Sequence, residues 1–124
     1  MVDVHKKMAE LFRTTLAEAD ITVDDVTRIA NVNISRELLH YRGMTALGLD
    51  MSKSTWEYGR ELGHCGACDQ ILSFDHLIST GQLRPGDHLL LLGTAAGIVL
   101  NCAVIKILEP APWADGELNS NGER

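Results

Sequence analysis

The stretch GQLRPGDHLLLLGTAAGIVLNCAVIKI, residues 81–107, carries the clearest structural signal in the chain. Its RPGD tetrapeptide, residues 84–87, is typical of a tight turn in which Pro85 sets the bend. The two apolar runs that follow, on either side of the small-residue loop GTAAG at 93–97, are typical of β-strands. Because both runs are apolar on both faces, they predict a sheet covered on both sides, as in layered α/β proteins.

Upstream of this hairpin, the apolar spacing predicts three helices and two further strands. A three- and four-residue period is typical of a helix, whereas a short run of apolar, β-branched or aromatic residues is typical of a strand. These patterns predict, in chain order, a helix at 6–19, a strand at 26–32, a helix from the N-cap Ser35 to Gly48, a strand at 53–58 and a helix at 68–80. The order of elements is therefore helix, strand, helix, strand, helix, strand, strand, which indicates an α/β layered domain with a mixed sheet.

Length and composition fit one folded domain. The chain has 124 residues, of which 45% are hydrophobic, and this is ample for a core. We expect the domain to span residues 1–109 and to be followed by a flexible tail at 110–124, because the tail has no hydrophobic period.

The charge balance excludes two classes of partner. There are 17 acidic against 11 basic residues and a net charge of −6, so neither nucleic acid nor an anionic membrane surface is expected to bind. The N-terminal residues lack the apolar core of a secretory signal, and the longest apolar run is too interrupted for a membrane-spanning helix. An odd count of three cysteines favours reduced thiols and a cytoplasmic location.

The segment GHCGACDQIL, residues 63–72, contains a Cys-x-x-Cys spacing that suits a redox motif, half of a metal site, or a loop with incidental cysteines. The element order and the placement of the prolines argue against a thioredoxin-like fold. A structural zinc site needs four ligands, and the remaining candidates lie on scattered elements, so no metal is expected. The simplest interpretation is that small residues are needed where the loop enters the helix.

The ending at 81–107, the acidic turn TVDDV before a strand, and the Gly-Leu pair followed by a further strand together resemble the C-terminal half of the β-ketoacyl-acyl carrier protein synthase III family. The similarity runs from about residue 6 to residue 108. It implies the thiolase fold, in which two similar halves pack together. It also implies that the nucleophilic cysteine belongs to the N-terminal half, while this half supplies a histidine and an asparagine that act on the thioester carbonyl.

Laid against that family pattern, the two residue types are exchanged. Asn33 stands where the family has its histidine, and His64 stands where the family has its asparagine. One hypothesis is a swapped electrophilic pair, since a neutral imidazole and a carboxamide can each donate a hydrogen bond to a developing oxyanion. The other is that the site has been lost or repurposed, and that the chain is a noncatalytic partner of another subunit.

Two further residues are candidates by the same resemblance. The backbone N–H of Ala96, in the GTAAG loop, corresponds to a family donor to the oxyanion, although a hairpin turn would also require small residues there. Arg36 replaces a family asparagine and could contact a phosphate of a pantetheine carrier, although a solvent-facing first helical turn is the simpler interpretation.

These observations together predict the C-terminal domain of a ketoacyl synthase III-like acyltransferase. It would act on acyl thioesters of coenzyme A or an acyl carrier protein, in condensation or acyl transfer for fatty acid or polyketide-type biosynthesis, without a separate cofactor. Alone it should be inactive. Because a single half would expose apolar surface, we expect a homodimer or a complex with an N-terminal half, with an acyl carrier protein as a further partner. The alternatives are a noncatalytic interface module and a part of a longer enzyme.

Overall fold

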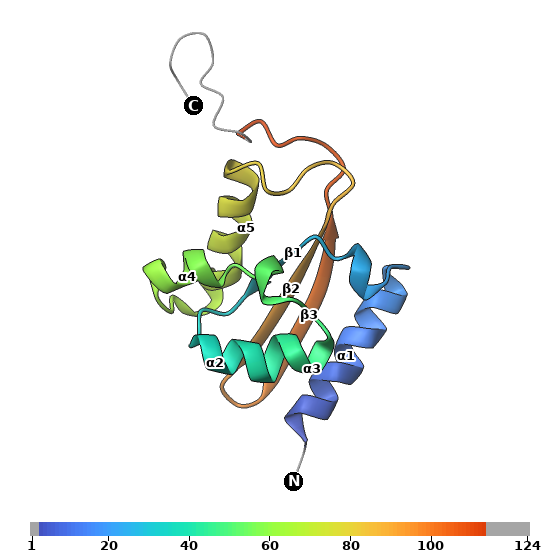
Figure 1. The fold of residues 1–124 in the computed structure, drawn as a ribbon, viewed down its shortest axis with the longest axis vertical. Coiled ribbons are helices and arrows are strands. Elements are labelled where there is room, and N and C mark those ends of the chain that lie inside the picture. The colour runs from blue at the N-terminus through green and yellow to red at the C-terminus, as the bar shows by residue number, and fades with distance from the viewer. Residues whose placement is uncertain (1–2, 114–124) are drawn as a thin grey trace.

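A three-stranded mixed sheet forms the centre of the molecule (Figure 1). The computed structural model describes residues 3–113, apart from the side chain of Arg42. The strands are β1 (Arg28–Asn31), β2 (His88–Ala95) and β3 (Val99–Lys106). β1 pairs in parallel with β2, and β2 pairs antiparallel with β3, so the hairpin expected from the sequence is confirmed.

Helices cover the first face of the sheet. α1 (Val4–Glu18) packs against β3, and beside it runs a continuous helical segment made of α2 (Arg36–Leu38), a π-helical turn (Leu39–Met44) and α3 (Thr45–Leu47). The core between these helices and the sheet is made of buried apolar side chains: Phe12, Leu16, Val26, Ile29, Leu39, Met44, Leu47, Leu49, Leu90 and Leu92. Removing this apolar surface from water is the main force holding the layer in place.

The second face is covered only in part. α5 (Asp69–Ser79) packs over β1 and, with the end of the chain, buries Ala30, Leu77, Ile78, Leu83, Leu89 and Ile107. On β3 the same face carries Asn101 and Ala103, which are exposed, and Ile105, which is half-buried. The expectation of a sheet covered on both sides therefore holds for β1 and most of β2, but not for β3.

The prediction of a strand at 53–58 is wrong. A short 3-10 turn, Met51–Lys53, leads instead into the helix α4 (Trp56–Leu62), and Ser54 makes only a single parallel bridge to Ile29. The reason is tertiary: the Arg28 guanidinium donates to the carbonyls of Lys53 and Ser54, which satisfies groups that a strand ladder would otherwise use.

The other expected elements are confirmed, and with them the α/β fold class. A short 3-10 turn, Val23–Asp25, precedes β1, and a second one, Gly66–Cys68, leads into α5. Gly48 ends α3 in the left-handed conformation, as expected for a glycine stop. Of the predicted tail at 110–124, Ala111 packs against the second core cluster, and residues 114–124 lie outside the described residues.

Candidate functional site

A buried carboxylate joins the end of β1 to the loop before α5. Asp69 is the first residue of α5 and has no exposed surface. Its Oδ2 accepts hydrogen bonds from the backbone N–H of Asn33 at 2.9 Å and from Nδ1 of His64 at 2.7 Å, and its Oδ1 accepts from the backbone N–H of Cys65 at 2.7 Å. Three groups from two separate loops therefore converge on one side chain.

The contacts of Asp69 also decide its charge. Burial raises the pKa of the Asp69 carboxyl, but the N–H groups of Asn33 and Cys65 and the His64 ring outweigh burial and hold that pKa below its ordinary value. The carboxyl is therefore ionised at neutral pH and can only accept hydrogen bonds. It follows that Nδ1 of His64 carries a proton. The His64 side chain is 60% exposed, and its other nitrogen, Nε2, has no hydrogen-bond partner among the described residues.

The Asn33 amide is hydrogen-bonded to the backbone of the His64 loop. Its Nδ2 donates to the carbonyl of Gly63 at 2.8 Å, and its Oδ1 is buried without a partner among residues 3–113. A Cβ at Gly59 would overlap this amide, so the glycine makes room for it. The structure thus brings the Asn33 backbone and the His64 ring together on Asp69.

Asn31 is a polar residue that the sequence interpretation overlooked. It is the last residue of β1, it is 2% exposed, and its Oδ1 accepts from the N–H and the hydroxyl of Thr55 at 3.3 and 3.4 Å. Its Nδ2 donates to the carbonyl of Val32. The signal that could have revealed it is an asparagine that directly ends an apolar run in RIAN, because ligand sites in α/β sheets lie at the carboxyl ends of strands.

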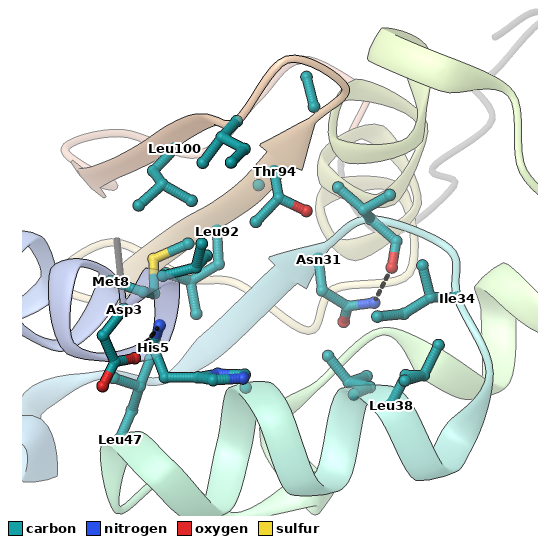
Figure 2. A pocket seen from close by; sticks show the side chains of 17 residues that line it. Asp3, His5, Met8, Asn31, Ile34, Leu38, Leu47, Leu92, Thr94 and Leu100 are labelled. Atoms are coloured by element: carbon teal, nitrogen blue, oxygen red, sulfur yellow. Dashed lines mark hydrogen bonds between the residues drawn. The ribbon is translucent and has the colours of Figure 1, made fainter. Parts of the chain in front are cut away.

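Asn31 borders a large, mostly apolar cavity of about 780 Å³. Figure 2 shows the Asn31 amide at the strand end, with Leu92 and Leu100 of the hairpin on one side and Leu38 on the other, and the His5 ring reaching in from the start of α1. A cavity of this size and character suits an apolar ligand chain with few polar contacts.

The remaining predicted residues lie around these features. Ala96 sits in the turn between β2 and β3, next to Gly97 and Ile98, which both have positive φ; Ala95 and Ile98 line the large cavity, but Ala96 does not. This geometry favours the hairpin-turn interpretation of Ala96. Arg36 lies in the first turn of α2 and is exposed, with its guanidinium 6.0 Å from the centre of the Trp56 ring.

All three cysteines are free thiols. Cys65 and Cys68 are exposed, and Cys102 is half-buried, where burial raises the pKa of its thiol. Within the described part of the chain, no three His, Cys, Asp or Glu side chains are grouped so that they could hold a metal ion. Over the same residues, no helix is both long enough and apolar enough to cross a membrane.

Comparison with known proteins identifies the same half-domain. The family described as 3-oxoacyl-acyl carrier protein (ACP) synthase III, C terminal, matches residues 16–107. No curated protein sequence matches the chain.

Three solved structures illustrate the range of the similarity. ChlB3, described as an acyltransferase, is 56% identical with a TM-score of 0.86, over 90% of this chain and 33% of its own. The synthase III FabH of Pseudomonas aeruginosa PAO1 is 19% identical with a TM-score of 0.73, over 88% of this chain and 34% of its own. The priming β-ketosynthase of the R1128 polyketide pathway is 17% identical with a TM-score of 0.73, over 87% of this chain and 32% of its own. The chain thus spans about one third of the length of the structures that it matches.

Proposed function

Because this chain belongs to the 3-oxoacyl-ACP synthase III family through that family's C-terminal domain, we propose that it is the half of an acyltransferase that supplies the catalytic histidine. Its substrate would be an acyl group carried as a thioester on coenzyme A or an acyl carrier protein. The nucleophilic cysteine would come from an N-terminal half, either on a separate chain or on a longer one.

One observation carries the proposal: the end of β1 and the His64 loop, where the family holds its histidine and asparagine, meet on the buried Asp69 carboxylate. Burying a charge is costly unless it is paired, so the three donors around the ionised Asp69 hold these two loops in one fixed arrangement. Of the two exchanged residues, His64 is the one with a free ring nitrogen, so we assign the chemistry to it.

The surroundings support an acyl substrate. The apolar cavity of about 780 Å³ begins at Asn31, within the same strand-end region, and has room for an acyl or pantetheine chain. The description of ChlB3 as an acyltransferase, at 56% identity over nearly the whole of this chain, supports acyl transfer in preference to condensation. The exposed Arg36 guanidinium is our candidate contact for a carrier phosphate.

The partly uncovered second face of the sheet supports a partner. Leu91 and Ile105 are only half-buried there, and Ile71 of α5 is 62% exposed. We propose that an N-terminal half, or a second copy of the chain, covers this surface. The free thiols of all three cysteines support a cytoplasmic location for the complex.

The test is reconstitution. The chain is mixed with an N-terminal half taken from a family member such as ChlB3 and supplied with a radiolabelled acyl-coenzyme A, and acyl transfer is measured. We expect transfer with the parent chain and a loss of about 100-fold or more with His64→Ala. His88→Ala, at the opposite end of the sheet, is the matched control and should leave transfer unchanged. Equal transfer by His64→Ala would contradict the role of His64, and no transfer with any such half would favour the noncatalytic partner.

A further inference from the structure

We propose that His64 and Asp69 form a proton-transfer dyad, in which His64 Nε2 is the general base and Asp69 is the positioning residue. The acyl acceptor would then be a hydroxyl or a thiol, whose proton must be removed, rather than a carbanion generated from a malonyl group. This inference rests on the proposed acyl transfer and names the class of its acceptor.

The first step of the argument is the locked geometry of the imidazole. Nδ1 of His64 lies 2.7 Å from Oδ2 of an aspartate that has no exposed surface, while the backbone N–H groups of Asn33 and Cys65 hold the same carboxylate from other sides. A carboxylate held in this way cannot rotate freely, so it orients the ring and selects its tautomer.

The second step follows from proton counting. A neutral imidazole has one N–H, and here it belongs to Nδ1, so Nε2 presents a lone pair toward solvent. Such a nitrogen can take up a proton, but in the neutral ring it cannot donate one to an oxyanion. The arrangement therefore suits a base, as in other histidines paired with a buried aspartate, and it does not suit the electrophilic role expected of a swapped pair.

The third step concerns the second donor that such a pair would need. One of the two N–H groups of the Asn33 amide is committed to the Gly63 carbonyl, and the Oδ1 of Asn33 is buried. Stabilising an enolate oxygen requires donors aimed at it, and the neutral His64 ring offers none from Nε2. Activating an O–H or S–H acceptor requires a base within reach of that proton, and Nε2 of His64 offers it.

The transfer step balances without an added reagent. The acceptor oxygen or sulfur forms a bond to the acyl carbon while its proton passes to Nε2 of His64. The carbon–sulfur bond of the donor thioester, here the acyl group on the cysteine of the N-terminal half, then breaks, and the proton moves from Nε2 to the departing cysteine thiolate. Acyl thioester and acceptor become acylated acceptor and free thiol, with no change of oxidation state.

The tautomer can be measured on the chain alone by long-range ¹⁵N–¹H NMR of histidine-labelled protein at about pH 8, with His64→Gln to assign the signals. We expect the Nδ1–H tautomer for His64, and a shift toward the Nε2–H form in Asp69→Asn. Asp75→Asn, an exposed aspartate of the same helix, is the control and should change nothing. An Nε2–H tautomer in the parent chain would overturn the dyad, whatever becomes of the Asp69 variant.

Reconstitution with the N-terminal half separates this inference from the function on which it rests. Acyl-coenzyme A is offered with N-acetylcysteamine as thiol probe, with glycerol as hydroxyl probe, or with malonyl-coenzyme A. We expect acylated thiol or acylated glycerol, lost about 100-fold or more in His64→Gln. If only a condensation product formed, the proposal of a hydroxyl or thiol acceptor would be wrong, whereas the proposal that the chain acts on acyl thioesters would stand. The absence of every product, together with an Nε2–H tautomer, would overturn both.

Discussion

The Asp69 carboxylate is the single side chain on which the candidate site depends, and its contribution can be measured as stability. It accepts three hydrogen bonds in a fully buried position. Asp69→Asn keeps the shape but places an NH₂ group against N–H donors, so we expect a loss of roughly 2–4 kcal/mol in the free energy of unfolding. Urea denaturation measures it. Asp75→Asn should stay within about 0.5 kcal/mol, and an equal effect of the two variants would contradict the arrangement.

The lowered pKa of Asp69 makes part of this stability depend on pH. A carboxyl whose pKa is lower in the folded than in the unfolded chain stabilises the fold above its unfolded pKa of about 3.9, and this stabilisation is lost as pH falls through the folded pKa. The stability difference between the parent chain and Asp69→Asn should therefore be constant near neutral pH and shrink below about pH 4. Denaturation series across this range check it, and a difference unchanged down to pH 2 would argue against an ionised Asp69.

Gly59 tests the position of the Asn33 amide. Glycine to alanine in a helix normally stabilises by about 1 kcal/mol, but here the added Cβ would overlap the Asn33 side chain. We expect Gly59→Ala to lose about 1–3 kcal/mol instead. Adding Asn33→Ala to this variant should recover part of the lost stability. Comparison with Asn33→Ala alone, in a double-mutant cycle, gives the interaction free energy between the two positions. A stabilising Gly59→Ala would mean that the amide lies elsewhere.

At the scale of elements, the sequence predicted what local periodicity determines. The spacing of apolar residues placed α1, α5 and the hairpin, because these patterns follow directly from the period of a helix or a strand. The segment at 53–58 could not be placed in this way. Thr55, Trp56 and Tyr58 are typical strand residues, yet the backbone there is held by the Arg28 side chain from another element.

The same limit applies to the site. The family pattern predicts Asn33 and His64 near each other, and the Asn33 backbone N–H and the His64 ring do meet on Asp69. Asp69 was not expected, because an aspartate in the first turn of a helix is common and is normally solvated. Only the packing of the β1 end against the loop turns it inward and makes it the shared acceptor.

Arg28 is the side chain that joins β1 to the segment after α3. Its guanidinium donates to the carbonyls of Lys53 and Ser54, each at 3.2 Å, and to the side chain of Gln82. Lysine would keep the charge but not the planar fork, so Arg28→Lys should lose about 1–2 kcal/mol by urea unfolding. Arg13→Lys on the exposed side of α1 should be neutral. If Arg28→Lys were as stable as the parent chain, the planar guanidinium would contribute little to holding β1 against the segment after α3.

At the scale of the whole molecule, the two faces of the sheet differ in how far they are covered. The first face is packed under α1 and the α2–α3 segment, whereas the second is packed under α5 only as far as β2. The uncovered area borders the α5 helix, whose first residue is Asp69. A partner seated on this face would therefore lie beside the candidate site and could bring a nucleophile to it.

Ile71 provides the test of that partner surface. It projects from the first turns of α5 and is 62% exposed, so Ile71→Glu should leave the stability of the isolated chain within about 0.5 kcal/mol. It should nevertheless weaken association, with a second copy or with the N-terminal half, by tenfold or more, because a charge would be buried in an apolar contact. Sedimentation velocity over a range of concentrations measures association with a second copy and with the N-terminal half. Tyr41→Glu, at another large and 70% exposed side chain but on the first-face side, is the control and should associate like the parent chain. If Ile71→Glu associated as well as the parent chain, the partner would have to bind another surface. If the parent chain stayed monomeric and did not bind the N-terminal half, the proposal of a partner on the second face would be wrong.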